Sequence, residues 1–264
     1  MTAVAETRTN MPLRSVHAAS PVFINSAIIL IIGFAVASAL QAFDMRLFNG
    51  VNVWEKPAKF FLSLSLHAAT LGWGLSLLPQ SEQRAPGVRR AAWLFAAAAT
   101  VEMIWIVWYA AQGQASHFNR TDPVAAAIYP VMGVVAVSLT GITMFTGWRI
   151  VRKGTSVMAF AAGSGFLLAG LLTTIVAGYM SSQTGHSVSG DITDETGLFF
   201  LRWSTTGGDL RPAHFAALHI AQAVPLVAWI RQERRVVWLS LLASVLIVAA
   251  LFFQALAGIP FLRV

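Results

Sequence analysis

Seven long apolar stretches dominate the sequence and limit the folds that it can adopt. They lie at residues 22–43, 58–78, 91–112, 124–148, 155–180, 212–230 and 235–258. A helix needs about 20 apolar residues to cross the hydrocarbon core of a bilayer, whereas a membrane-spanning strand is about half as long and alternates in polarity. The sequence therefore predicts an all-α membrane protein, a bundle of seven transmembrane helices. A tail at residues 1–21 precedes it, and residues 22–264 form a single domain.

The composition excludes most soluble functions. Hydrophobic residues make up 56% of the 264 residues and charged residues only 11%, whereas about 25% of the residues in a soluble domain are charged. A water-soluble enzyme and a nucleic-acid-binding protein are excluded on this ground, although the net charge is +7. The expected partner is the lipid bilayer. The absence of cysteine excludes disulfides, thiolate metal sites and iron–sulfur clusters.

The positive charges predict an orientation in the membrane. If the N-terminus lies inside, the inner segments 1–21, 79–90, 149–154 and 231–235 hold eleven Lys and Arg residues against three acids. The outer segments, counted with the helix ends, hold seven of each. Because cytoplasmic loops are enriched in Lys and Arg, the N-terminus is predicted inside and the C-terminus outside.

The longest connection is predicted on the outer side. Residues 181–211 form an outer loop of more than 30 residues, and a loop of that length without its own helix is usually functional or disordered. Its apolar run at residues 198–201 and Trp203 suit a segment that folds back on the membrane surface. We expect this loop to close over a pocket as a lid.

Imidazole and carboxyl groups are predicted at similar depths beneath the outer surface. Counting the helical rise from the helix ends places His67 and Glu102 about 15 Å down, His219 roughly 10 Å down and His214 about one turn in. An ionised carboxylate at that depth costs several kcal/mol, so Glu102 is expected to be paired, protonated or metal-bound. Because histidine is the commonest metal ligand, we predict a divalent metal, zinc or iron, held by His67, Glu102 and His219 or His214.

The favoured function is a metal-dependent membrane enzyme. A catalytic zinc site keeps one position open for water or substrate. Glu102, Asp209 and His117 are the predicted catalytic residues, the last two as proton carriers. Since the site opens outward, we expect the substrate to be a lipid or a small periplasmic molecule.

A b-type haem electron carrier is the first alternative. His67 and His219 or His214 would be the axial ligands, Lys59 or Arg211 would meet the haem propionates, and a quinone would be the redox partner. The predicted cofactor-binding residues are Lys59, Arg211 and His214.

A proton-coupled transporter is the second alternative, with Glu102 and His67 as a proton relay. Each signal also has a plain structural interpretation. A neutral Glu102 or a neutral His67 can form a hydrogen bond between helices, and Asp209 can cap the sixth helix.

Three runs of the sequence resemble those of an uncharacterised family of bacterial polytopic inner-membrane proteins. They are residues 54–60 (Trp-Glu-Lys-Pro-Ala-Lys-Phe), 115–119 (Ala-Ser-His-Phe-Asn) and 203–211 (Trp-Ser-Thr-Thr-Gly-Gly-Asp-Leu-Arg). The resemblance covers most of the chain. It implies a multi-pass location in the inner (cytoplasmic) membrane of a bacterium and carries no function.

A second, partial similarity is to the CREST membrane hydrolases, the alkaline ceramidases and their relatives. Their second helix carries Ser-x-x-x-His, which Ser63 and His67 match, and their third-helix acid corresponds to Glu102. The similarity implies a buried zinc among seven helices. The chain departs from the family at the His-x-x-x-His pair of the last helix, because His214 and His219 lie on the sixth stretch with four residues between them.

Overall fold

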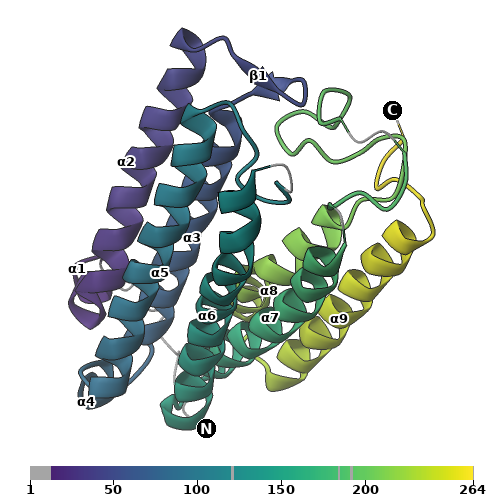
Figure 1. Ribbon diagram of the computed structural model, residues 1–264. Helices are drawn as coiled ribbons and strands as arrows, with labels where there is room; N and C mark the ends of the chain where they lie inside the picture. The colour runs from purple at the N-terminus through teal and green to yellow at the C-terminus, as the bar shows by residue number, and fades with distance from the viewer. Residues whose placement is uncertain (1–12, 120–121, 184, 191–192, 264) are drawn as a thin grey trace, which may run out of the picture.

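Seven helices of 20 to 31 residues run side by side in the computed structural model, which describes residues 13–119, 122–183, 185–190 and 193–263 (Figure 1). Each predicted apolar stretch coincides closely with one of them. They are α2 (Pro21–Phe43), α3 (Glu55–Ser76), α5 (Pro86–Ala111), α6 (Pro123–Lys153), α7 (Val157–Ser182), α8 (Arg211–Ile230) and α9 (Arg234–Leu256).

The remaining elements are short. Helix α1 (Leu13–Ala19) lies in the segment predicted as a tail, and α4 (Gln80–Gln83) lies between α3 and α5. Strands β1 (Leu47–Phe48) and β2 (Val51–Asn52) pair antiparallel through a turn in which Asn49 and Gly50 both have positive φ. Two such residues between paired strands are typical of a type I′ hairpin turn.

The surface of the long helices is apolar, as expected of a membrane protein. Exposed side chains include Ile29 at 68%, Val134 at 70% and Phe253 at 65% of their full accessibility, and such exposure of large apolar residues along whole helices favours contact with lipid. Six of the seven long helices are long and apolar enough to cross a bilayer. Helix α3 is the exception, because it carries polar and charged residues along its length.

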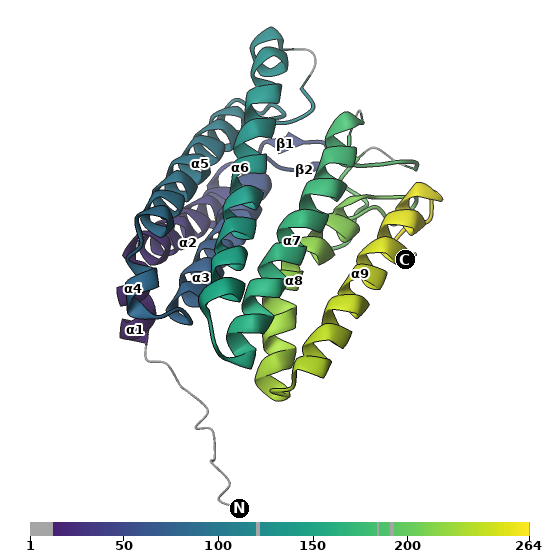
Figure 2. The ribbon, with the colours of Figure 1, turned by 90° about the horizontal axis from the view of Figure 1, so that it is seen from below.

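The helices form two groups with α6 between them. Figure 2 shows α2, α3 and α5 on one side of α6 and α7, α8 and α9 on the other. Glycines bring α6 and α7 into backbone contact: a Cβ atom added to Gly147 would lie 2.6 Å from the carbonyl oxygen of Gly163. Small residues at such contacts let helices approach closely in a membrane, where packing replaces the hydrophobic effect.

The two ends of the bundle are built differently. We call the end that carries residues 44–54, 112–122 and 183–210 the loop end, and the opposite end, with residues 77–85, 154–156 and 231–233, the short-turn end (Figure 1). At the short-turn end, Glu82 forms ion pairs with Arg149 and, at 3.2 Å, with Lys153. Of the residues predicted to carry chemistry, Glu102, His117, His214 and Asp209 lie toward the loop end, whereas His67 lies near the middle of α3.

Candidate functional site

Glu102 and His117 form a buried ion pair inside the bundle. Glu102 lies on α5 and is 4% exposed, and its Oε1 lies 3.2 Å from Nε2 of His117. Its other oxygen, Oε2, is buried without a hydrogen-bond partner among the residues that the structure describes. The partner of the intramembrane carboxylate is therefore a histidine, but it comes from a loop rather than from a neighbouring helix.

The chain reverses sharply after α5, and this reversal carries His117 to Glu102. Gly113 has a φ of +68°, and the amide of Gln114 donates to the carbonyl of Tyr109 (3.0 Å), as in a glycine-terminated helix. The loop then runs back along α5, where Nε1 of Trp105 donates to the carbonyl of Ser116 (2.7 Å). Because Trp105 lies three residues after Glu102, this bond holds the next residue, His117, beside the carboxylate.

The second ring nitrogen of His117 faces an ammonium and a hydroxyl group. Its Nδ1 lies 3.3 Å from Nζ of Lys56 on α3 and 3.0 Å from Oγ of Ser116. Lys56 has only donors, so Nδ1 accepts when it bonds to Lys56, and Nε2 then carries the hydrogen that Glu102 accepts. The arrangement is a chain of three ionisable groups, ammonium, imidazole and carboxylate, through which a proton can pass.

Burial and the charge of Lys56 lower the pKa of the His117 imidazole below its usual value, and Glu102 opposes them. The lowered pKa favours a neutral ring at pH 7. A neutral imidazole can accept a proton on one nitrogen and give one up from the other. His117 is thus suited to the proton-carrier role that the sequence predicts for it.

An open hollow lies beside this loop. It has a volume of about 670 Å³ and is lined by Phe48, Gly113, Gln114, Ala115, Phe118, Asn119 and Asp122. Five of these residues, 113–115 and 118–119, flank Ser116 and His117 directly in the sequence. The hollow places a space for a ligand next to the segment that carries His117.

His67 lies apart from this pair and makes different contacts. Its Nε2 lies 2.7 Å from the hydroxyl of Thr143 on α6, which itself donates to the carbonyl of Leu139. The ring stacks on Phe95 at a centroid distance of 5.7 Å. These are the contacts of a histidine satisfied between helices.

The two histidines of α8 lie on the same side of the bundle as His67. His219 is close enough to both His67 and His214 to interact with them electrostatically. Its Nδ1 bonds to the carbonyl of Phe215 (2.8 Å), whereas Nδ1 of His214 is buried without a hydrogen-bond partner among the described residues. His67 and His214 thus each interact with His219, and Glu102 is held elsewhere by His117.

Asp209 and Arg211 hold the long connection between α7 and α8. Oδ2 of Asp209 accepts from the amide of Ser204 (2.9 Å), and its carboxylate accepts from the guanidinium of Arg211. Arg211 also bonds Asp194 at 2.8 Å and the carbonyl of Arg202. Although burial opposes it, hydrogen bonds from His186 and Arg211 lower the pKa of Asp209 well below its usual range.

A second ionic cluster fastens the same connection to α3. Glu55, only 8% exposed, accepts from Arg202 at 2.9 and 3.0 Å and from Lys59 at 2.6 Å. The predicted lid is therefore a loop tied at two points of its C-terminal part: to the start of α3 through Arg202 and to the start of α8 through Arg211. Lys59, predicted as a cofactor-binding residue, is part of this tie.

The sequence did not predict the contacts of Glu55, Lys56 or Arg202. The run at residues 54–60 marks the first two as part of an unusual charged start to an apolar stretch. His117, the partner of Lys56, lies 61 residues away in the sequence, and Arg202, the partner of Glu55, lies 147 residues away. Spacing within one helix cannot reveal contacts that depend on how distant loops fold back.

Among the residues that the structure describes, no three His, Asp or Glu side chains gather in a group that could hold a metal ion. Among the described residues, the predicted ligands His67, His219 and His214 do not form such a group, and Glu102 pairs with His117 instead. The predicted zinc or iron site and the alternative haem b stay predictions, which elemental analysis and an absorption spectrum of the purified protein would check.

Comparison with known proteins returns no matching family model, no matching curated protein and no matching solved structure.

Proposed function

We propose that the protein spans the membrane seven times, with its N-terminus in the cytoplasm and its C-terminus outside, in the inner membrane of a bacterium. Six of the long helices are apolar enough to be candidate spans, and we propose α3 as the seventh span. Its 22 residues suffice to cross a bilayer, and its polar side chains Ser65, His67 and Thr70 bond to residues inside the protein or to its own helix. The excess of Lys and Arg at the short-turn end supports a cytoplasmic location of that end.

Single-cysteine labelling tests this topology, since the natural chain has no cysteine. Ser189 lies exposed at the loop end and Ser81 lies exposed at the short-turn end. In intact cells, a membrane-impermeant maleimide should label Ser189→Cys and should label Ser81→Cys only after the membrane is opened. The reverse pattern would overturn the orientation, and labelling of both in intact cells would overturn the three spans α5, α6 and α7 that separate the two sites.

We propose further that the protein is a membrane-embedded enzyme that uses Glu102 and His117 for acid–base chemistry on a lipid or a small periplasmic substrate. The observation that carries this proposal is the buried contact of 3.2 Å between Glu102 and His117, with Lys56 on the other ring nitrogen. Ionisable residues inside a membrane are costly and are functional by default. The hollow of about 670 Å³ beside the loop supplies space for a substrate.

In this proposal Glu102 orients the ring and His117 moves the proton. Glu102 accepts the hydrogen on Nε2. The lone pair on Nδ1, which accepts from Lys56 in the structure, takes a proton from a substrate hydroxyl or a water molecule once the ammonium of Lys56 has turned aside. Glu102 then stabilises the imidazolium that forms, as a carboxylate does beside a catalytic histidine. The nearby positive charge of Lys56 favours the return of that proton from the imidazolium to the product, and Ser116 is the hydroxyl that already faces Nδ1.

The titration of His117 checks the relay directly. Lys56→Met removes a neighbouring positive charge and should raise the pKa of His117, whereas Glu102→Gln removes the group that supports the charged ring and should lower it. Nitrogen-15 NMR of histidine-labelled protein in detergent measures both shifts. Two shifts in the same direction, or no shift with either variant, would contradict the contacts on which the proposal depends.

Activity is tested with the lipids themselves as substrates. Purified protein is incubated with a bacterial lipid extract and with the soluble periplasmic fraction, and products are detected by mass spectrometry. General acid–base groups contribute about 10²- to 10⁴-fold to rate, so a conversion by the natural protein should fall by that factor in His117→Asn and Glu102→Gln. A conversion that both variants carry out at the natural rate would rule out these residues as the catalytic pair.

A further inference from the structure

The N-terminal turns of α5 carry an arginine pair that none of the described residues neutralises. Arg89 and Arg90 are both exposed, and neither guanidinium has an ion pair or a hydrogen bond with a residue that the structure describes. The nearby acid, Glu82, is already paired with Arg149 and Lys153. Two positive charges are thus left for a partner outside the protein.

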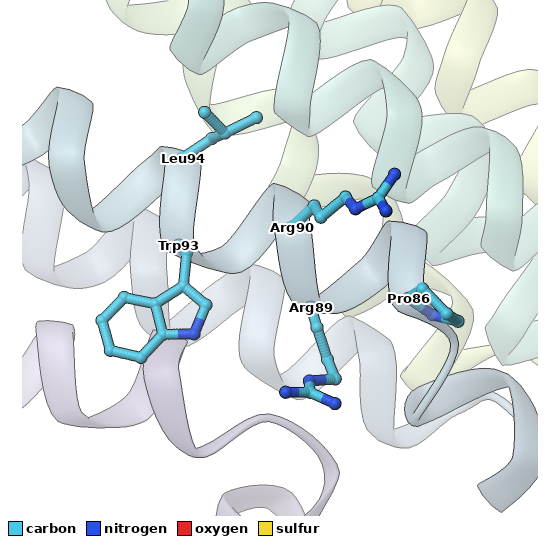
Figure 3. Close-up of a pocket in the computed structure, with 5 residues that line it drawn as sticks. All are labelled: Pro86, Arg89, Arg90, Trp93 and Leu94. Carbon is cyan, nitrogen blue, oxygen red and sulfur yellow. The ribbon is translucent and has the colours of Figure 1, made fainter.

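Apolar side chains continue from each arginine along the helix. Trp93 and Leu94 are 64% and 61% exposed, and each lies four residues after one of the arginines, on the same face of α5. Figure 3 shows Arg89 and Trp93 pointing to one side of the helix and Arg90 and Leu94 pointing to the other. A hollow of about 610 Å³ is lined by these four residues and Pro86.

We propose that this hollow binds the headgroup of an anionic phospholipid in the leaflet at the short-turn end. The order of side chains along α5 matches the order of groups along a lipid. The two guanidiniums lie at the level of the phosphate, where they can bond its oxygens bidentately, and Trp93 and Leu94 lie where the glycerol and acyl chains begin. Trp side chains are enriched at this depth because their rings are amphipathic.

Charge complementarity decides between an anionic and a zwitterionic lipid. Arginine held near a membrane surface attracts anionic lipid, and a zwitterionic headgroup adds an ammonium group that two unpaired guanidiniums repel. The described part of the short-turn end contains nine Lys and Arg residues, at positions 84, 89, 90, 149, 152, 153, 231, 234 and 235, against Glu82 and Glu233. On α5 this excess charge meets exposed apolar side chains beside a hollow, whereas the start of α9 has the same sequence pattern, with Arg234 and Arg235 four residues before the exposed Trp238 and Leu239.

Native mass spectrometry of the full protein, released from nanodiscs of phosphatidylcholine with 20% phosphatidylglycerol, tests the proposal. The natural protein should retain phosphatidylglycerol in preference to phosphatidylcholine. Arg89→Gln with Arg90→Gln should weaken this retention roughly 25-fold, because each surface arginine contributes about fivefold to the binding of anionic lipid.

The control pair is Arg84→Gln with Arg231→Gln, which removes the same charge from the same end but leaves the hollow intact. It should retain phosphatidylglycerol almost as the natural protein does. Trp93→Ala should lower retention with both arginines in place. Equal loss in the two arginine pairs, or unchanged retention in Arg89→Gln with Arg90→Gln, would overturn the proposal, as would displacement of the lipid by inorganic phosphate, which would make the site one for a free anion.

Discussion

Replacing Asp209 with alanine should lower the free energy of unfolding by about 3–5 kcal/mol, the usual cost of removing one partner from a buried ion pair. The side chain of Asp209 is 0% exposed. Its loss leaves the guanidinium of Arg211 without its nearest carboxylate and the amide of Ser204 without its acceptor. The connection at residues 183–210 should come loose from the start of α8. Thermal unfolding in detergent, with limited proteolysis of that connection, measures the effect.

Glu195→Ala is the matched control for Asp209→Ala. Glu195 belongs to the same connection and is exposed, so its replacement should change the unfolding free energy by no more than about 0.5 kcal/mol. An equal effect of the two substitutions would show that Asp209 contributes nothing special to the loop.

The pH dependence of Asp209→Asn gives a second check on the same group. The pKa of Asp209 is lowered in the folded protein, so the stability that it contributes is complete above the ordinary aspartate pKa of about 3.9 and is lost as the pH falls through the lower folded value. The difference in stability between the natural protein and Asp209→Asn should therefore stay constant from about pH 5 to 8 and shrink only in stronger acid. A difference that already shrinks near neutral pH would contradict the lowered pKa.

The helices were predictable because a bilayer demands one kind of segment. A chain that crosses hydrocarbon must satisfy its backbone hydrogen bonds within itself, so a long apolar run can only be a helix. The observed helix ends differ from the predicted ends where the sequence is polar but still helical. Helix α6 continues from the predicted residue 148 to Lys153, through two arginines and a lysine that leave the apolar run but suit the last turns of a helix.

Glu102 and His117 could each be singled out from the sequence, but the contact between them could not. Glu102 could be singled out because a carboxylate within an apolar stretch needs a partner. That partner could not be read from helical depth, because His117 reaches Glu102 through the reversal at Gly113 and the bond between Trp105 and Ser116. Counting residues along helices finds groups at one level, and it does not find groups that a loop carries back into the bundle.

Replacing His117 with alanine should destabilise the protein by about 3 kcal/mol, because it leaves both oxygens of Glu102 buried without a partner. Glu102→Gln alone should cost only about 1 kcal/mol, since the neutral amide can still bond to the ring. The double variant, His117→Ala with Glu102→Gln, should be more stable than His117→Ala alone, because the buried charge that lost its partner is no longer there. Unfolding of the four proteins in detergent forms a double-mutant cycle, and the coupling between the two sites should be about 2 kcal/mol.

His17→Ala serves as the control for His117→Ala, since His17 is exposed and bonds only to Asn25 among the described residues. It should change stability by no more than about 0.5 kcal/mol. If the effects of His117→Ala and Glu102→Gln on the free energy of unfolding simply add, the two side chains do not interact. The acid–base pair proposed for this protein would then be ruled out. If they are coupled while Lys56→Met leaves the titration of His117 unchanged, the carboxylate and the ring form a pair but the ammonium lies outside the relay. The cycle thus tests the geometry of the pair independently of any substrate.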